Sequence, residues 1–446
     1  MVCQEAIMGF RGEASVFSSP AEAVAGMVSR LGVNRARMEA CPLTSVRGRI
    51  LAETIFADRD SPAFDYSAMD GYAIRLSDFH SSADPISTNW SPASGFQSNS
   101  GQISMPVVGE VRIGSAPAPM PSFPACIRIV TGAGIPIGAD AVIKREDVVE
   151  CGTPGGVTEV TLIAARAAAI RSGDNIRRRA ENVQAGASVL KAGSLVSSAS
   201  IGTLAAVGCT MPQVYSRLRV AIITTGDELV SPDAMPTTFQ IRNSNGPALH
   251  SLFAAQEWLE VVSATHVNDD GSSLSATLQN AMKGADAIVL SGGVSMGHRD
   301  PVRTAIDQLG AEVVFHGLPQ RPGKPMLGAV LNLTDDRRIP LFGLPGNPIS
   351  AMVTAVRIVM PVFASCAGML QFATPTYVAV ENHDGKSLDM WWHRLVRVNS
   401  QGTAELVDGR GSGDIMAASR SDGFIELPPH TAETKIPHYS YYPWPT

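Results

Sequence analysis

The feature that most constrains the fold is an alternation of short apolar runs with amphipathic helical segments, from about residue 217 to 372. The apolar runs favour strands and read "LRVAII", "EVVSA", "DAIVL", "EVVF" and "IPLFG". Apolar strands that alternate with helices are typical of a doubly wound, largely parallel sheet, because helices cover both of its faces. We therefore predict a multi-domain α/β protein built around such a sheet.

The segments between these strands have the apolar spacing of helices. In "GPALHSLFAAQEWL", Leu249, Leu252 and Phe253 share one face, and "SSLSATLQNAM", "PVRTAIDQL" and "PISAMVTAVRIVM" are further helical segments. Another helix is predicted near the N-terminus, where Ser19 can cap it and Gly32 can end it.

The remaining sequence has a more β-like character. Short runs separated by Pro, Gly and Ser predict an irregular β domain before the sheet, with its loosest segment at residues 81–124. Four β-like runs near the C-terminus predict a small barrel, with a sandwich as the alternative. The predicted domains are a connecting domain of helical and extended segments (19–45 and 166–216), the irregular β domain (46–165), the α/β domain (217–372) and the C-terminal β barrel (373–446).

Composition excludes several classes of partner. The 446 residues carry a net charge of -6, which gives no basic footprint for nucleic acid. The most apolar stretch, "VRIVMPVFASCAGML", is too short to span a membrane and contains Arg357 and Pro361. The six cysteines are far apart, as free thiols in a reducing compartment would be. We predict a cytoplasmic protein with no nucleic-acid or membrane partner.

Glycine-rich turns follow three of the predicted strands. They are "TTGDEL", "SGGVSMGHRD" and "GLPGNP". Loops after parallel strands gather at one edge of the sheet, and glycines let the backbone amides there approach an anionic ligand. Any one of these glycines could instead serve only to turn a corner. Together the turns predict a pocket for a phosphorylated ligand, bound by Gly226, Asp227, Ser291, Gly292, Gly293, Ser295, Pro345, Gly346, Asn347 and Pro348.

Carboxylates accompany the same strand ends. They are Asp227, Glu228, Asp269, Asp270 and Asp300. Acids from adjacent strand ends could share one Mg²⁺, which binds carboxylate oxygens and bridges phosphates. For Asp227 and Asp270, capping of the next helix is an equally good interpretation. His298 and His316 have no second ligand at metal-binding spacing.

A basic turn, "QRPGKPMLG", follows the strand "EVVF". Arg321 and Lys324 flank a Pro-Gly pair, and the prolines stiffen the segment. Two cations fixed on a rigid turn can bind an oxyanion, whereas a solvated basic turn is the alternative.

Six motifs together resemble one known family. They are "SPAFDYSAMDGYAI", "RIVTGAGIPIGADAVI", "TTGDEL", "SGGVSMGHRD", "RPGKP" and "GLPGNPISA". In this order they are similar to molybdopterin molybdenumtransferases of the MoeA type, which are related to the E domain of gephyrin. The resemblance covers roughly Ser19 to Pro428 and implies that the central sheet is of the molybdopterin-binding type.

The resemblance also implies an activity. Family members insert molybdenum from molybdate into adenylylated molybdopterin, release AMP and use Mg²⁺. They are homodimers whose site is shared, so that Asp70 and Thr131 would come from the partner subunit. A molybdopterin adenylyltransferase and molybdoenzymes are the further partners that the resemblance implies.

Further residues receive roles by the same resemblance. Glu228, Asp269 and Asp300 match the acids that hold the metal, and Pro345 and Pro348 match the prolines of the third turn. Molybdate would be held by Arg321, Lys324, Arg394 and Ser412.

The chain departs from the family pattern at "RSDGFIELP", where the family usually has Ala-Asn-Gly, and at two positions where the charge changes. Asn182 stands where the family has an aspartate, and His316 stands where it has a lysine. These changes motivate an alternative, a paralogue that binds or hands over molybdopterin without turnover. A receptor-clustering scaffold and a stand-alone pterin adenylyltransferase fit the motifs less well, because the second would leave "MDGYA" unexplained.

Overall fold

The computed structural model describes residues 15–32, 37–78, 97–99, 102–294, 301–333, 337–372, 375–430 and 438–445. The chain forms two compact units. The first combines Met1–Thr54 with Leu190–Thr446, and the second is Ile55–Val189. The finer domain boundaries given above stay a prediction.

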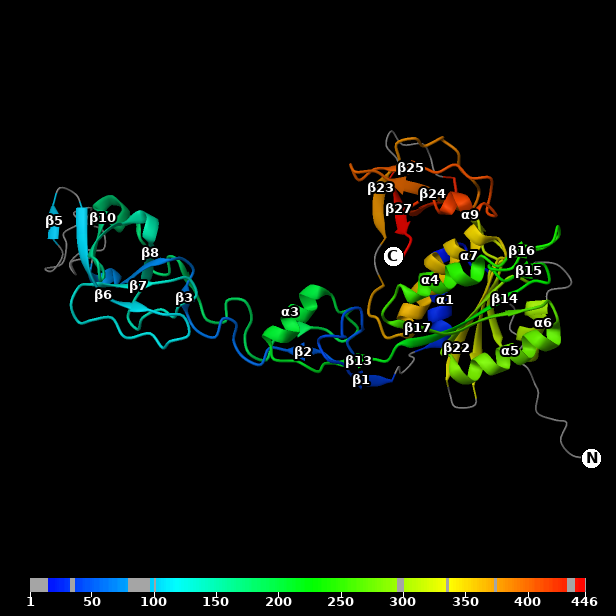
Figure 1. Cartoon of the computed structure of the whole chain (residues 1–446), viewed down its shortest axis with the longest axis horizontal. Coiled ribbons are helices and arrows are strands. Elements are labelled where there is room, and N and C mark those ends of the chain that lie inside the picture. The colour runs from blue at the N-terminus through cyan, green and yellow to red at the C-terminus, as the bar shows by residue number, and fades with distance from the viewer. Residues whose placement is uncertain are drawn as a thin grey trace, which may run out of the picture. The chain divides into compact units, whose positions relative to one another are not determined.

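The first unit is built around a sheet of six strands in the order β17–β14–β18–β22–β21–β19 (Figure 1). The strands are β14 (Leu218–Thr225), β17 (Leu259–Val267), β18 (Ala287–Ser291), β19 (Glu312–His316), β21 (Leu327–Asn332) and β22 (Arg338–Leu344). The first four strands in the sheet order are mutually parallel, which confirms the largely parallel sheet. Strand β21 was not predicted, and it pairs antiparallel with both β22 and β19.

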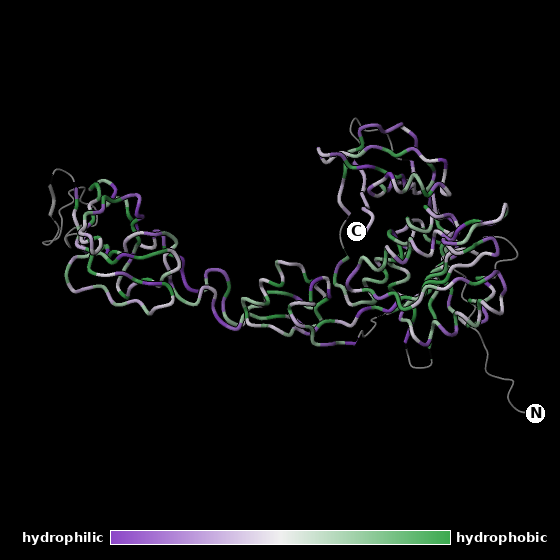
Figure 2. The backbone as a smooth tube through the Cα atoms, viewed as in Figure 1, coloured by the Kyte–Doolittle hydropathy of each residue, from purple (hydrophilic) through white to green (hydrophobic). Residues whose placement is uncertain are grey.

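Helices cover both faces of this sheet, as the alternating sequence predicts. Side chains on one face of β14, including Val220 and Ile222, pack with α1, α4 and the long helix that contains α7 and α8. Ala221 and Ile223 point to the other face, where α5 and α6 lie. The strands accordingly appear as hydrophobic segments in Figure 2. The helices are α1 (Pro20–Leu31), α4 (Asn245–Ala254), α5 (Gly271–Gly284), α6 (Pro301–Gln308), α7 (Pro348–Thr354) and α8 (Met360–Cys366).

The ends of α1 confirm the predicted signals. The Ser19 hydroxyl accepts a hydrogen bond from the Glu22 N–H, and Gly32 ends the helix with φ +69°. A side-chain cap at the start and a glycine at the end both satisfy backbone groups that the helix leaves open.

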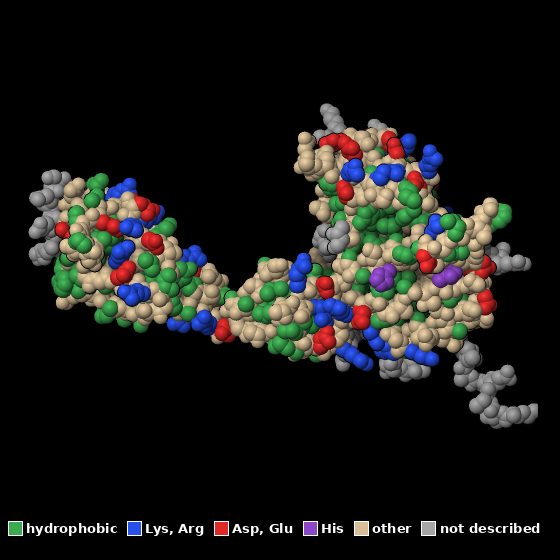
Figure 3. Space-filling view, viewed as in Figure 1, with side chains coloured by type: hydrophobic (Ala, Val, Ile, Leu, Met, Phe, Trp, Pro, Cys, Tyr) green, Lys and Arg blue, Asp and Glu red, His purple; other side chains and the backbone are tan. Residues whose placement is uncertain are grey.

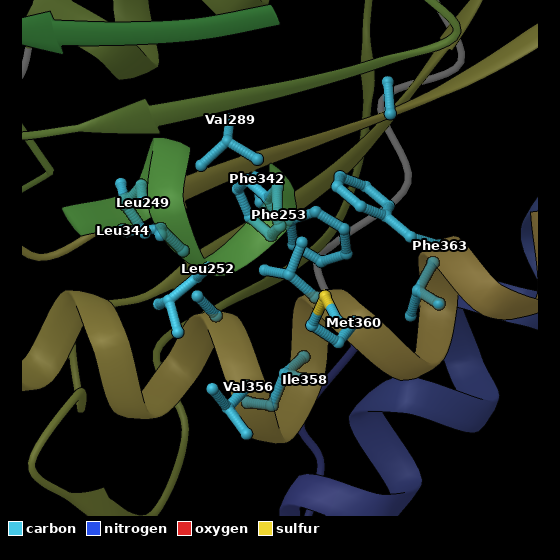
Figure 4. Close-up of a cluster of buried hydrophobic side chains, with 14 of the residues drawn as sticks. Leu249, Leu252, Phe253, Val289, Phe342, Leu344, Val356, Ile358, Met360 and Phe363 are labelled. Carbon is cyan, nitrogen blue, oxygen red and sulfur yellow. The ribbon is translucent and has the colours of Figure 1, made fainter. Parts of the chain in front are cut away.

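A single long helix, Pro348–Cys366, forms the centre of the larger core (Figure 4). Phe363 packs against Phe253 of α4 and Phe342 of β22, with ring centroids 5.7 Å and 6.0 Å apart. The helix is long and apolar enough to cross a membrane by composition, but 78% of its most apolar window is buried inside the protein. It is therefore a core helix of the α/β domain.

This helix changes to a π turn at Ala355–Val359. Pro361 lies two residues after this turn and has no N–H to donate to the carbonyl four residues earlier, so a local widening of the helix relieves the conflict. The turn carries Arg357, which is only 9% exposed.

Arg357 joins the helix to the C-terminal sheet through a buried ion cluster. Its Nε and Nη2 donate to the two oxygens of Glu426, at 2.6 Å and 3.1 Å. His393 Nε2 lies 3.1 Å from Glu426 Oε2, and the guanidinium lies over the Tyr442 ring at 5.3 Å. The cluster is a buried polar link between the core helix and the C-terminal sheet.

The C-terminal sheet closes into a small barrel, as predicted. Its order is β20–β24–β26–β27–β23, with β25 beside β24, and the bridge between Val380 and Ala404 closes the ring. Strand β27 was not predicted. The elements are β20 (Gln320–Arg321), β23 (Thr376–Ala379), β24 (Trp391–Val398), β25 (Ala404–Leu406), β26 (Gly423–Leu427), β27 (His438–Pro443) and helix α9 (Ile415–Ala418).

Short elements complete the first unit. Strands β1 (Met38–Ala40) and β13 (Gln213–Tyr215) pair antiparallel, and β15 (Leu229–Val230) pairs in parallel with β16 (Ile241–Arg242). Helix α3 (Ser198–Ala206) begins at a capping box formed by Ser197 and Ser200.

The second unit contains a sheet in the order β8–β4–β7–β6–β10–β9, with β5 beside β6. Within the segment expected to be loop-rich, residues 102–111 form the long strand β6, whereas residues 81–96 lie outside the described part of the chain. The elements are β3 (Tyr66–Ser67), β4 (Gly71–Ile74), β5 (Gln97–Asn99), β6 (Gln102–Val111), β7 (Cys126–Ile129), β8 (Ala141–Lys144), β9 (Val149–Thr153), β10 (Gly156–Ile163), α2 (Ala164–Ala169) and β11 (Ile176–Arg177); β2 (Ile55–Phe56) pairs with β12 (Ser188–Leu190).

Candidate functional site

The three glycine turns meet at the carboxyl edge of the central sheet. Thr224, Ser291 and Leu344 stand in register near the ends of β14, β18 and β22. The Gly292 N–H donates to the Leu344 carbonyl at 3.2 Å, so the second turn is bonded to the third. The predicted convergence of the turns is confirmed.

Gly292 is the position where only glycine fits. Its φ is +100°, and a Cβ there would lie 2.3 Å from the Thr225 carbonyl oxygen. A Cβ on Gly346 would meet the Gly292 Cα at 3.8 Å. The second turn is therefore packed tightly between the first and the third, which brings their backbones together.

Two asparagines at the start of α4 hold the turns in place. Asn243 Nδ2 donates to Thr224 Oγ1 at 2.7 Å. Asn245 Nδ2 donates to both Ser291 Oγ and the Gly346 carbonyl, each at 2.8 Å. Neither asparagine was predicted to belong to the site, although the repeated asparagine of "NSNG" at the start of a helix is a signal.

The acids of the first turn and of the turn after β17 lie on the exposed side of this edge. Asp227, Glu228 and Asp269 are all exposed. The Asp227 carboxylate accepts the Asp269 N–H at 3.0 Å, so the two turns are joined. Asp227 thus acts between turns and caps no helix.

Asp270 has a structural role at the start of α5. Its carboxylate accepts from the hydroxyls and N–H groups of Ser273 and Ser272, which lower its pKa to about 2. The capping interpretation is therefore confirmed for Asp270. The carboxylate of its neighbour Asp269 does not cap this helix and can bind a ligand.

The metal site is only partly described. Ser295 and Asp300 lie outside the described residues. Among the residues that are described, no three His, Cys, Asp or Glu side chains form a group that could hold a metal ion. Mg²⁺ needs only one or two protein carboxylates when phosphates and water complete its shell, so Glu228 and Asp269 fit this requirement.

The basic turn is rigid and carries two exposed cations. Gly323 has φ +98°, and a Cβ there would lie 2.4 Å from Thr354 Cγ2. Buried Gln320 holds the turn by donating to the Gly323 carbonyl at 3.1 Å. Within the described part of the chain, Arg321 and Lys324 make no salt bridge, so both charges are available to a ligand.

The third turn is bonded to a loop of the barrel. Asn347 Nδ2 donates to Ser412 Oγ at 3.0 Å, and the Ile349 N–H donates to the Ser412 carbonyl at 3.0 Å. Pro345 is buried, and Pro348 is the first residue of α7. The basic turn packs on Thr354, the last residue of α7. The rise of a helix places Thr354 about 9 Å along the axis from Pro348.

Arg394 is engaged elsewhere. It forms a two-pronged salt bridge with Asp384, at 2.6 Å and 3.0 Å, and its guanidinium lies 4.4 Å from the centre of the Trp392 ring. This pairing holds the pKa of Asp384 far below its usual range. The described contacts do not bring Arg394 to Ser412, and its role in binding molybdate stays a prediction.

Asp70 and Thr131 lie together in the second unit. The N–H and the hydroxyl of Thr131 donate to Asp70 Oδ1, at 2.8 Å and 2.9 Å, and hold the pKa of Asp70 below its usual value. Gly71 cannot be replaced, because a Cβ there would lie 1.8 Å from the Ile143 carbonyl oxygen. The two residues belong to separate sequence motifs, and the structure joins them by these hydrogen bonds.

The positions that depart from the family pattern have defined surroundings. Asn182 Oδ1 accepts a hydrogen bond from Arg177 at 3.0 Å, and Glu181 pairs with the same arginine at 2.9 Å. His316 is half-buried at the end of β19.

Comparison with known proteins identifies the family. The sequence matches the MoeA N-terminal region (domain I and II) over residues 18–208 and the probable molybdopterin binding domain over residues 221–365. A molybdopterin molybdenumtransferase of Nostoc is 33% identical over 398 residues, which are 87% of this chain and 85% of that protein. Molybdopterin molybdenumtransferase 2 of Mycobacterium tuberculosis is 34% identical over 74% of this chain and 77% of that protein.

The fold is shared with a solved structure of the molybdopterin biosynthesis moeA protein from Pyrococcus horikoshii. The TM-score is 0.74 at 23% identity, over 95% of this chain and 99% of that one. The motifs, the sheet and the matched relatives agree, and the chain belongs to the MoeA family of molybdopterin molybdenumtransferases.

Proposed function

We propose that this chain inserts molybdenum from molybdate into adenylylated molybdopterin and releases AMP. The observation that carries the proposal is the joined set of glycine turns with exposed acids at one sheet edge. Tightly packed turns present backbone N–H groups to phosphate oxygens, and adjacent carboxylates suit a phosphate-bound cation.

The acids are assigned to Mg²⁺. Glu228 and Asp269, together with Asp300, would hold the ion against the phosphates of the substrate. Bound Mg²⁺ would neutralise charge on the phosphoanhydride that breaks when AMP leaves. Asp227 positions Asp269 through its bond to the Asp269 N–H. Asn245 keeps the second and third turns at a fixed spacing.

The basic turn is assigned to molybdate. Molybdate is a tetrahedral dianion, and it requires fixed cations together with hydroxyl or amide donors. Arg321 and Lys324 supply the charge, and Ser412, bonded to Asn347, supplies a hydroxyl beside the third turn. The salt bridge with Asp384 makes Arg394 a weaker electrostatic contributor.

The direct test is AMP release. Purified protein is mixed with adenylylated molybdopterin, molybdate and Mg²⁺, and AMP is measured by chromatography. Release that depends on both molybdate and Mg²⁺ is expected. Bound pterin without AMP would overturn the proposal.

A homodimer with a shared site is part of the proposal. Asp70 and Thr131 would then act on the turns of the partner subunit. Mixing Asp70→Asn with Asp269→Asn subunits should restore about a quarter of the wild-type activity, since half of the dimers carry one intact site. If the two inactive variants stay inactive after subunit exchange, the shared site is wrong.

The cytoplasmic location and the hand-over partners, a molybdopterin adenylyltransferase and molybdoenzymes, are part of the same proposal. We expect the chain to pull down either partner from cytosol. Substitutions at the turn edge, the carboxyl edge of the central sheet that carries the three glycine turns, should weaken this interaction.

A non-catalytic paralogue is the second candidate, and Asn182 is the observation behind it. Glu181 already supplies a negative charge to Arg177, which favours retained activity. Asn182→Asp should therefore change the rate of AMP release little. A large gain from an inactive wild type would support the paralogue.

A further inference from the structure

A cavity lies at the opposite edge of the central sheet from the glycine turns. It has a volume of ≈ 440 Å³ and is lined by the first residues of β14 and β22, by β17 and by the segment around β1 and β13. Strand β14 separates the two edges by about 23 Å at 3.3 Å per residue. The cavity is therefore distinct from the proposed active site, and the reaction does not use it.

Arginines dominate the lining of this cavity. There are six of them, namely Arg37, Arg49, Arg217, Arg219, Arg337 and Arg338. Three acids line the same cavity, Glu39, Glu260 and Asp286. Basic side chains gather in this region of the surface in Figure 3. The lining has a formal excess of three positive charges, which the carbonyl end of α8 offsets only in part.

The pairing within the lining leaves two arginines without an acid. Arg219 is bound by both oxygens of Asp286, at 2.9 Å and 3.0 Å. Arg49 contacts Glu39 and donates to the Tyr215 carbonyl. Within the described residues Arg37 has no carboxylate partner, and Arg338 donates only to a backbone carbonyl, that of Arg30.

Part of the lining is fixed in position, because one of its arginines is buried. The side chain of Arg49 is 8% exposed, and its buried Nε has no hydrogen-bond partner. An arginine held in this way has already lost most of its side-chain freedom, so a ligand would not have to order it. The volume is also within the range of small-ligand pockets.

We propose that this cavity binds a phosphate anion with at least two negative charges, of the pyrophosphate or nucleoside polyphosphate class. Planar guanidinium groups that converge from several elements match phosphate oxygens in pairs. Arg37 and Arg338 supply the uncompensated charge, and Arg49 and Arg219 form the fixed wall.

The test measures binding by calorimetry in buffer with EDTA, with pyrophosphate and ATP as separate probes. Omission of Mg²⁺ keeps the proposed active site from taking up metal-bound phosphate. Binding of pyrophosphate should weaken about tenfold or more in Arg37→Ala/Arg338→Ala, since each substitution removes a charge-assisted contact. Arg397→Ala, an exposed arginine of the barrel, is the matched control and should bind like the wild type.

The two probes separate the sources of phosphate. Tighter binding of ATP than of pyrophosphate identifies a nucleotide ligand, whereas equal binding identifies the phosphate groups alone. Lys324→Ala, which removes a cation of the basic turn, should bind both probes like the wild type, which separates this cavity from the proposed active site, and AMP release by the double arginine variant should be unchanged. Absence of binding to the wild type, or equal binding by the double variant, overturns the proposal.

Discussion

Two groups of carboxylates in the first unit differ in how many hydrogen bonds their oxygens accept from the protein. Glu426 is 6% exposed, and both of its oxygens accept hydrogen bonds, from Arg357, His393 and Tyr442. At the turn edge, Glu228 and Asp269 are exposed, and their side chains accept no hydrogen bond from the described residues.

The difference separates structural charge from functional charge. A buried carboxylate must be saturated, because an unpaired buried charge is very costly. An exposed carboxylate needs no protein partner, because water solvates its charge, and it can therefore bind a cation. Substitution at the buried cluster should therefore affect folding, and substitution at the turn edge should affect catalysis.

The largest effect is expected from Arg357→Met. Removal of the arginine leaves Glu426 charged and buried, which should lower the free energy of unfolding by about 3–5 kcal/mol. Denaturant unfolding, followed by the barrel tryptophans, measures it. Arg303→Met, at an exposed salt bridge with Asp307, is the control and should change stability by less than about 0.5 kcal/mol. Wild-type stability in Arg357→Met would mean that the cluster does not hold the barrel.

The next effect in size is expected from Asp269→Asn. Loss of one proposed metal ligand should slow AMP release by about 10²–10³-fold without a change in unfolding. Asp270→Asn is the matched neighbour, since it weakens the cap of α5 but removes no proposed ligand. Equal losses of rate in both variants would contradict the division of roles between these adjacent acids.

Asn245→Ala tests a polar group that is expected to contribute both to stability and to ligand binding. The change leaves Ser291 Oγ and the Gly346 carbonyl without their donor, at a cost of about 1–3 kcal/mol. We expect weaker pterin binding, seen as a raised KM, together with a modest loss of stability. Asn243→Ala, which loosens only Thr224, should have the smaller effect on KM.

The smallest effect is expected from pH. Burial would raise the pKa of Glu426, but the hydrogen bonds from His393 and Arg357 outweigh it and lower the pKa from 4.5 to about 2. A lowered pKa stabilises the fold above the unfolded value, and this stabilisation is lost only as the pH falls from about 4.5 to 2. Unfolding of the barrel should therefore be insensitive to pH between about 8 and 5. A change in barrel stability between pH 8 and 5 would contradict the assignment to Glu426.

The sequence predicted those features that depend on local pattern. The caps of α1 and the helices and strands of the parallel sheet follow from side-chain periodicity, and the meeting of the glycine turns follows from parallel strand direction. The antiparallel strand β21 was missed because "LGAVLN" directly follows the basic turn and shows no alternation. Strand β27 was missed because its side chains, "HYSYYP", are polar or aromatic and do not alternate between apolar and polar, although Tyr439 is buried.

The site was predicted less completely than the fold. The turns and the exposed acids are visible in the sequence because glycine and aspartate after a strand are unusual. The contacts of Asn245 join distant segments, and the pairing of Arg394 with Asp384, ten residues apart, crosses an irregular loop, so no local pattern reports either. Ser295 and Asp300 were selected from the sequence and stay predictions.

The basic turn has one consequence for how the first unit moves. Arg321 pairs with Trp392 in the barrel, while Gly323, two residues later, fits closely against Thr354 of the core helix. The turn therefore connects the barrel to the core helix, and a shift of one relative to the other would displace both cations. An oxyanion bound by Arg321 and Lys324 would therefore restrict this shift, and its departure would remove the restriction.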